Sequence, residues 1–152
     1  MTDTPEGKSA SASPPRPKPS SDGARTALAG KRIVIVEDEG ITQMQLRRSL
    51  TRSGLVVVGT ASTAESGIEV VLRERPDLVL MDIRMPGEFD GLEGARRILA
   101  QYQVCIVMLT AYAVEEYRER AREIGACGYL LKPVIAETLL DLLEQAYNGF
   151  DV

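Results

Sequence analysis

The feature of this sequence that most restricts its fold is an alternation of short apolar runs with longer amphipathic segments. The runs have the length and composition of strands and cover Ile33–Val36, Leu55–Gly59, Leu78–Met81, Val104–Leu109 and Gly128–Leu131. Each is followed by a segment whose apolar residues recur at about 3.6-residue spacing, as on a helix with one buried face. Strict alternation of strand and helix predicts an α/β fold, in which helices cover both faces of a parallel sheet.

Capping and helix-breaking residues mark the ends of the predicted helices. The first helix is predicted over 42–53, before Gly54, and the fourth ends at Gly125. Ser62 and Glu65 have the spacing of a capping box at the start of the second helix. The last helix is predicted to end at a cap formed by Asn148-Gly149, after a buried stripe made of Ile135, Leu139, Leu142 and Ala146.

The first 30 residues differ in composition from the rest of the chain. They contain five of its eight prolines, among Ser, Thr, Gly and Ala. Such a segment does not bury enough apolar surface to offset the entropy lost on ordering, so we predict a disordered Pro/Ser-rich tail over 1–30. A proline-rich docking peptide is the alternative to a plain tether. The folded domain is predicted over 31–148, with a short C-terminal tail over 149–152.

Composition excludes several classes of function. The net charge of −4 and the pI near 5.0 give no basic field for nucleic acid, so no direct nucleic-acid binding is expected. No apolar run approaches the ~20 residues that span a bilayer, and we expect a cytoplasmic protein. Cys105 and Cys127 are predicted to be buried, reduced thiols. The chain has no histidine, which excludes catalysis or phosphate relay through a histidine of its own.

Polar residues at the ends of four apolar runs are expected to meet. Right-handed crossovers place the carboxyl ends of parallel strands along one edge of the sheet, where ligands bind in open α/β folds. The side chains predicted at this edge are Glu37, Asp38, Asp82, Thr110 and Lys132.

This set of side chains points to phosphate chemistry. Three neighbouring carboxylates repel one another unless a cation lies between them, and Mg²⁺ takes oxygen ligands while keeping waters that a phosphate oxygen can replace. A lysine and a hydroxyl nearby suit an oxyanion. We therefore predict phosphoryl transfer, with Asp82 as the nucleophile or as a metal ligand.

Five motifs occur in one order along the chain, namely Val36–Glu39, Leu80–Pro86, Asp90–Glu93, Leu109–Ala111 and Gly128–Pro133. In sequence, order and spacing they resemble the receiver domain of two-component response regulators, the domain typified by the chemotaxis regulator. The resemblance covers about residues 31–148. It implies a flavodoxin-like, doubly wound, five-stranded parallel sheet of order 2-1-3-4-5 with five helices.

The resemblance also assigns roles at the predicted edge. It implies that Asp82 accepts a phosphoryl group from a partner histidine kinase or histidine phosphotransfer protein, forming an acyl phosphate that hydrolyses slowly. Glu37, Asp38 and Asp82, with the backbone carbonyl of Arg84, match the positions that hold Mg²⁺ (or Mn²⁺) in the family. Such a protein is a phosphorylation-dependent signalling switch, either alone or as part of a longer regulator.

Three further residues match positions that report phosphorylation in the family. Thr110 matches the hydroxyl that bonds the new phosphoryl group, Lys132 matches the lysine that pairs with it, and Tyr129 matches the aromatic residue that turns inward afterwards. The implied output is a change at the face made by the fourth helix, fifth strand and fifth helix, read by an unknown downstream protein or by a phosphorylation-dependent dimer. Tyr112 and the segment Arg118–Leu131 also resemble receivers that precede RNA-binding antitermination domains.

One segment departs from the family pattern. The loop between Pro86 and Gly91 is one residue longer than the commonest family loop and borders the expected ion. Arg84 and Tyr112 occupy positions that vary in the family and tune the hydrolysis of the phosphoryl group.

Two other functions remain as alternatives. The first is a receiver-like interaction module that works without phosphorylation. The second is an aspartyl phosphatase similar to haloacid dehalogenases, but that chemistry usually needs a second acid two residues after the nucleophile, where this chain has Arg84.

Overall fold

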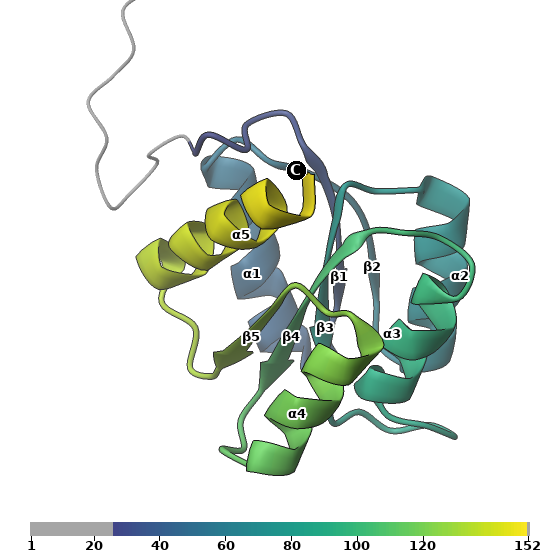
Figure 1. The fold of residues 1–152 in the computed structure, drawn as a ribbon. Coiled ribbons are helices and arrows are strands. Elements are labelled where there is room, and N and C mark those ends of the chain that lie inside the picture. Colours follow the sequence, from purple (N-terminus) through teal and green to yellow (C-terminus); the bar gives the residue numbers. More distant parts are fainter. Residues whose placement is uncertain (1–25, 152) are drawn as a thin grey trace, which may run out of the picture.

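The structure is a computed structural model, and it describes residues 26–151 apart from the side chain of Asp151. Five strands form one parallel sheet, and five helices lie against it (Figure 1). The elements in chain order are β1 (Arg32–Val36), α1 (Gly40–Arg52), β2 (Val56–Ala61), α2 (Ala64–Glu74), β3 (Leu78–Asp82), α3 (Gly91–Leu99), β4 (Cys105–Thr110), α4 (Glu115–Ile124), β5 (Gly128–Leu131) and α5 (Ala136–Asp151).

The strand order is β2-β1-β3-β4-β5, which confirms both the predicted α/β class and the order expected from the resemblance. β1 pairs with both β2 and β3, so the chain direction across the sheet reverses after β2. This reversal creates a crevice at the carboxyl ends of β1 and β3. The register pairs Val36 with Met81, and Asp82 with Leu109.

The helices cover the two faces of the sheet, α1 and α5 on one face and α2, α3 and α4 on the other (Figure 1). Residues of β1, β3 and β4 alternate between the two apolar cores, as the two-residue period of a strand requires. Leu80 and Leu109, for example, pack with α1 and α5, while Met81 and Met108 pack with α2 and α3.

β3 is the centre of this arrangement, because all five of its residues are buried. Sheet neighbours on both sides and helices on both faces leave no solvent-facing position, which explains why its sequence is a continuous apolar run. Burial of each Leu or Met side chain contributes about 1.5–3 kcal/mol, which fixes β3 firmly. Asp82 is the single charged residue of this strand and is only 5% exposed.

Two predicted helix ends are wrong in detail. The capping box of α2 uses Thr63 and Ser66 in place of Ser62 and Glu65, since the helix begins at Ala64. Glu65 is thereby free to accept a hydrogen bond from the backbone of Glu88 at 2.7 Å. At the other end of the chain, α5 continues through Gly149 to Asp151, so Asn148-Gly149 does not cap it.

The buried stripe of α5 also differs from its prediction. Ile135 precedes the helix and is 64% exposed, whereas Leu143 is fully buried beside Leu139 and Ala146. These three residues have the i, i+4, i+7 spacing of one helix face, and Leu142 lies at the margin of that face. The stripe begins one turn later than expected.

Residues 26–30 belong with the folded domain, although the sequence analysis placed them in the tail. Leu28 is 3% exposed and packs in the core between the sheet, α1 and α5. Thr26 donates a backbone hydrogen bond to Ser53 at 2.9 Å, and its hydroxyl donates to Glu144. The prediction of disorder for residues 1–25 lies outside the described residues.

Two further predictions concern the cysteines and membrane insertion. Both cysteines are unpaired thiols, Cys105 buried and Cys127 partly buried. Among residues 26–151, no helix is long and apolar enough to cross a bilayer.

Candidate functional site

The side chains predicted at one edge of the sheet do lie there together. Asp82 is the last residue of β3 and Thr110 the last residue of β4. Glu37 follows β1 directly, and Lys132 follows β5 directly. β1, β3 and β4 are neighbours, and β5 pairs with β4, so four strand ends supply one site.

Lys132 bridges two buried carboxylates at this site. Its Nζ atom lies 2.6 Å from Oε1 of Glu37 and 3.1 Å from Oδ2 of Asp82. Glu37 is fully buried, Asp82 nearly so, and the Lys132 side chain is 15% exposed. Two carboxylates therefore share one ammonium group, and the site retains excess negative charge.

The pKa values reflect this imbalance. Burial raises the pKa of Asp82 to about 7, and the negative charge of Glu37 acts in the same direction, while Lys132 opposes both. Burial alone would lower the pKa of Lys132, but the hydrogen bond with Glu37 and the charge of Asp82 outweigh it and raise that pKa. In the metal-free site the lysine is firmly charged, and Asp82 changes charge near neutral pH.

The acidic cluster fits a small divalent cation. Carboxylate oxygens of Glu37, Asp38 and Asp82 all lie within 4.8 Å of one another, and Asp38 is exposed to solvent. Oε1 of Glu37 is buried and lies 2.6 Å from the Lys132 ammonium group, and a carboxylate oxygen in one such contact keeps a lone pair for a cation. Hard carboxylate oxygens on one open side are the ligand set of Mg²⁺, which keeps several of its waters.

Local hydrogen bonds hold Glu37 in place. Oε2 of Glu37 accepts the backbone N–H of Glu39 at 3.1 Å. The Gln43 side chain donates to the backbone carbonyl of Glu37 at 2.8 Å and to that of Ala61 at 3.2 Å. Gln43 therefore ties α1 to the ends of β1 and β2, a role that its sequence position did not reveal.

Thr110 lies fully buried beside this cluster. Its Oγ1 accepts a hydrogen bond from the backbone N–H of Tyr112 at 3.1 Å, and its carbonyl accepts one from the N–H of Lys132 at 2.8 Å. Since Asp82 pairs with Leu109, Thr110 stands one residue further along the neighbouring strand. Thr110 thus connects the β4–α4 loop to the start of the loop after β5.

Tyr112 connects Arg84 to Tyr129 above the site. The Arg84 guanidinium lies 4.5 Å from the centre of the Tyr112 ring, and the Tyr129 hydroxyl donates to the Tyr112 carbonyl at 3.3 Å. Arg118 of α4 lies in turn 4.8 Å from the Tyr129 ring. The sequence did not reveal these contacts, because they join side chains from four separate segments.

A hollow of about 670 Å³ opens beside the acidic cluster. Its lining comes from three loops at the carboxyl edge and from α4, and comprises Asp38, Arg84, Met85, Pro86, Asp90, Tyr112 and Tyr117. Asp38 thus faces a space large enough for a phosphoryl group and its waters.

The long loop after β3 is anchored at several points. Gly91 N–H donates to the Ile83 carbonyl at 2.7 Å, and a Cβ atom at Gly91 would stand 1.9 Å from the Asp82 carbonyl, so only glycine fits there. Glu88 is held by Glu65 from α2, and Asp90 caps α3 by accepting the N–H of Glu93 at 2.9 Å. The loop therefore lies against the start of α2 at Glu88, directly after Gly87, whose φ is +130°.

Comparison with known proteins places this geometry in a family. Residues 33–144 match the response regulator receiver domain. Transcriptional regulatory protein PdtaR of Mycobacterium tuberculosis is 36% identical over 124 residues, which cover 82% of this chain and 60% of that protein. Response regulator GacA of Pseudomonas aeruginosa is 31% identical over 78% of this chain and 56% of that protein. The chain belongs to the response regulator receiver family.

Solved structures agree with this assignment. The signal receiver domain of a modulated diguanylate cyclase from Desulfovibrio desulfuricans has a TM-score of 0.74 and 33% identity, covering 80% of this chain and 97% of that one. A CheY-like receiver domain protein from Methanospirillum hungatei has a TM-score of 0.74 and 27% identity, covering 81% of this chain and 98% of that one. The match to these receiver domains is nearly complete, whereas the chain spans only about 60% of PdtaR.

Proposed function

We propose that this protein is a phosphorylation-dependent switch that accepts a phosphoryl group on Asp82 from the phosphohistidine of a partner kinase or phosphotransfer protein. The observation that carries the proposal is the position of Asp82. It is the last residue of a fully buried strand, its carboxylate contacts Lys132, and it forms an acidic cluster with Glu37 and the exposed Asp38. Receiver family membership supports it, and the 152-residue sequence contains no histidine, so the donor histidine lies outside this sequence.

The chemistry follows from the charges around Asp82. A carboxylate oxygen of Asp82 attacks phosphorus, the bond from phosphorus to the donor nitrogen breaks, and an acyl phosphate forms. Mg²⁺ held by Glu37, Asp38, Asp82 and the Arg84 carbonyl would neutralise the carboxylates and the phosphoryl oxygens and keep Asp82 ionised. Lys132, already 3.1 Å from Asp82, is placed to move from the carboxylate to a phosphoryl oxygen.

A phosphoryl group on Asp82 would also offer a new acceptor to the Thr110 hydroxyl. In the present structure that oxygen accepts the N–H of Tyr112. A hydroxyl can donate and accept at the same time, so the proposed switch depends on a rotation of Thr110 toward the phosphoryl group. That rotation would break the bond to the Tyr112 N–H, on the same residue whose carbonyl accepts the Tyr129 hydroxyl. A shift of the Tyr112 peptide would move the acceptor of the Tyr129 hydroxyl, and Tyr129 would then change position. The change would extend to the face made by α4, β5 and α5.

The same linkage separates the switch from a module that works without phosphorylation. A module of that kind would not need a buried hydroxyl at the end of the strand next to Asp82, or a largely buried ammonium group in contact with the Asp82 carboxylate. Such polar groups are expensive to bury, and they are understandable here as a prepared oxyanion site.

The test is intact-mass spectrometry after incubation with acetyl phosphate and Mg²⁺. We expect one phosphoryl group on the wild type and on Asp141→Asn, a matched control in which an exposed carboxylate of α5 is changed. Asp82→Asn should gain none, and EDTA should abolish the modification of the wild type. Phosphorylation of Asp82→Asn to the wild-type level, or none on any protein, would reject the proposal in favour of the interaction module.

A further inference from the structure

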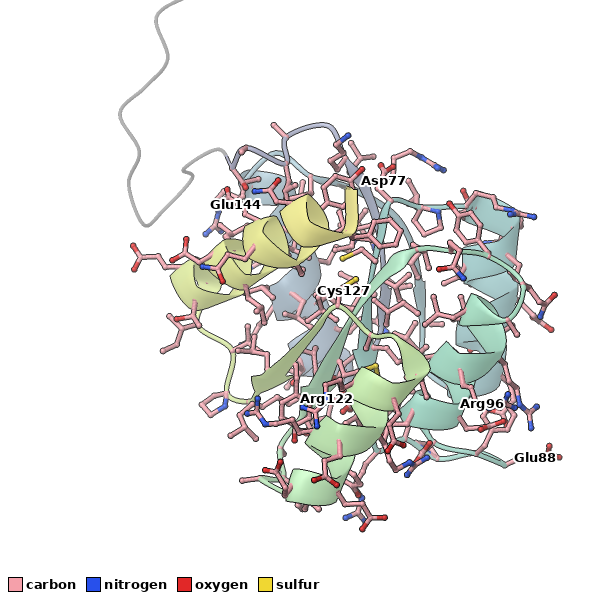
Figure 2. All side chains as sticks on the ribbon, in the orientation of Figure 1. Asp77, Glu88, Arg96, Arg122, Cys127 and Glu144 are labelled. Carbon is pink, nitrogen blue, oxygen red and sulfur yellow. The ribbon has the colours of Figure 1, made fainter. Side chains whose placement is uncertain are left out.

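Two thiols lie together at the edge of the sheet opposite Asp82. Cys105 is the first residue of β4, and Cys127 directly precedes β5, so both are at amino-terminal strand ends. Figure 2 shows two sulfur atoms side by side at the label of Cys127, and a hydrogen bond links the two thiols. This pair has no role in the phosphoryl chemistry proposed above.

The backbone holds the two cysteines at a distance that suits a disulfide. The N–H of Cys127 donates to the carbonyl of Ile106, the residue after Cys105, at 2.8 Å, and the β4–β5 ladder begins at the next pair, Val107 and Gly128. With strands ~4.8 Å apart and a rise of ~3.3 Å per residue, the two Cα atoms are roughly 6 Å apart. Disulfides span Cα separations of about 4.4–6.8 Å.

Both side chains also point the same way. Cys105 belongs to the core that α1 and α5 cover, and Cys127 packs against that same core. Both thiols therefore lie on the same side of the sheet, where their sulfur atoms can approach each other. The sequence contains no third cysteine, so no other intramolecular pairing competes.

The two thiols differ in access and in acidity. Cys105 is fully buried, whereas Cys127 is partly exposed. The hydrogen bond from the Cys105 thiol lowers the pKa of Cys127 to about 7, against the effect of burial, and the same bond together with burial raises the pKa of Cys105. Cys127 is thus the nucleophile that an oxidant reaches, and Cys105 is the neighbour that can resolve the product.

We propose that Cys127 and Cys105 form a reversible intramolecular disulfide when a hydroperoxide oxidises Cys127. The Cys127 thiolate attacks the distal peroxide oxygen, the O–O bond breaks, and the leaving alkoxide or hydroxide takes up a proton to become an alcohol or water. The resulting sulfenic acid is attacked by the Cys105 sulfur. The S–O bond breaks, the Cys105 proton joins the departing hydroxyl as water, and the peroxide is the two-electron oxidant.

The disulfide would join the beginnings of β4 and β5. Tyr129 lies on β5 and Lys132 directly follows it. In the oxidised protein the disulfide would restrict movement of β5 relative to β4, and β5 connects the phosphate site to the output face. Formation of the bond does not require that Asp82 be phosphorylated, so the two proposals stand or fall separately.

The test is a hydrogen peroxide titration of the full reduced chain, followed by alkylation with iodoacetamide and peptide mass mapping. We expect wild type to lose both alkylatable thiols together, with a disulfide-linked peptide pair that dithiothreitol separates. Loss of one thiol without the other, or disulfides only between chains on a non-reducing gel, would overturn the proposal.

Two serine variants assign the separate roles. In Cys105→Ser, Cys127 should accumulate as a sulfenic acid that dimedone traps, because the resolving thiol is gone. In Cys127→Ser, Cys105 should react at least about tenfold more slowly than the wild-type pair, since it is buried and its thiol is not ionised. If Cys105 in Cys127→Ser reacts as fast as the wild-type pair, with circular dichroism showing the native fold, the assignment of Cys127 as the reactive thiol is refuted.

Discussion

Oε1 of Glu37 lies 2.6 Å from the ammonium nitrogen of Lys132, and the carboxylate is completely buried. The ion pair joins the end of β1 to the residue after β5 across the intervening strands β3 and β4. Because the same ammonium also contacts Asp82, the charge balance of the whole site depends on one side chain.

Removal of Lys132 should therefore destabilise the metal-free protein. Lys132→Met leaves two buried carboxylates without their cation, and breaking a buried pair in this way costs about 3–5 kcal/mol. Urea denaturation in EDTA measures the loss, and added Mg²⁺ should recover part of it. Lys31→Met, which changes a lysine beside the Tyr147 ring, is the control and should cost no more than about 1 kcal/mol. Equal losses for the two variants would mean that the Lys132 pair contributes no special stability.

The raised pKa of Asp82 predicts a pH dependence with a definite sign. The folded-state pKa is about 7 and the ordinary value is 3.8, so the native state binds the proton more tightly than the unfolded chain. The stabilising contribution is complete below the ordinary value and is lost as pH rises through about 7. Thermal unfolding in EDTA should show wild type losing stability relative to Asp82→Asn as pH rises from about 4 to about 7. A constant difference between the two proteins would contradict the shift.

The contact between Arg84 and Tyr112 predicts how long the phosphoryl group survives. The stacked pair lines the hollow beside Asp38, and we expect it to limit the access of water to an acyl phosphate on Asp82. Such a contact contributes about 0.5–1 kcal/mol, so Arg84→Ala should speed dephosphorylation by roughly 2- to 5-fold. Decay of the phosphorylated mass after removal of the donor gives the rate. Arg73→Ala, on the remote helix α2, should leave it unchanged, and slower decay in Arg84→Ala would show that the arginine assists hydrolysis.

The link from Thr110 through Tyr112 predicts that Tyr129 responds to a phosphoryl mimic. In fluorotyrosine-labelled protein, beryllofluoride with Mg²⁺ should shift the ¹⁹F resonance that Tyr129→Phe identifies. Thr110→Val should bind the mimic without this shift. This variant lacks the hydroxyl through which the mimic would change the hydrogen bonding of Tyr112, and so the position of Tyr129. A full shift in Thr110→Val would break the proposed link. Tyr147, on the far part of α5, provides an internal resonance that should stay constant.

The packing of Leu28 predicts where the stable domain begins. Leu28→Ala should destabilise the protein by about 2–3 kcal/mol, because it opens a cavity in the core beneath α1 and α5. Ile41→Ala is the matched control, since Ile41 is 69% exposed and its truncation should change stability by no more than about 0.5 kcal/mol. Chemical denaturation measures the free energy of unfolding of both variants. A loss for Leu28→Ala as small as that for Ile41→Ala would mean that Leu28 does not belong to the stable domain.

Some features of this fold follow from the local sequence, and others depend on packing. β3 was predictable because Leu78–Met81 must be buried on both faces, whatever their neighbours are. The convergence of Asp82 with Lys132 was predictable because parallel strands end at one edge. The cap of α2 was not, because Ser62 and Thr63 are equally able to cap and the packing of the helix decided between them. The packing of α5 against the sheet likewise decided that Leu143 lies in the core and that Ile135 is exposed.

The sequence by itself determined the alternation of strands and helices, the sheet edge that carries the charges, and the residue types available there, because local periodicity and chirality dictate all three. Only the tertiary structure decided that Lys132 bridges Glu37 and Asp82, that Arg84 stacks on Tyr112, and that Leu28 completes the core. These contacts join segments far apart in the chain, and their distances depend on how the helices and loops pack around the sheet.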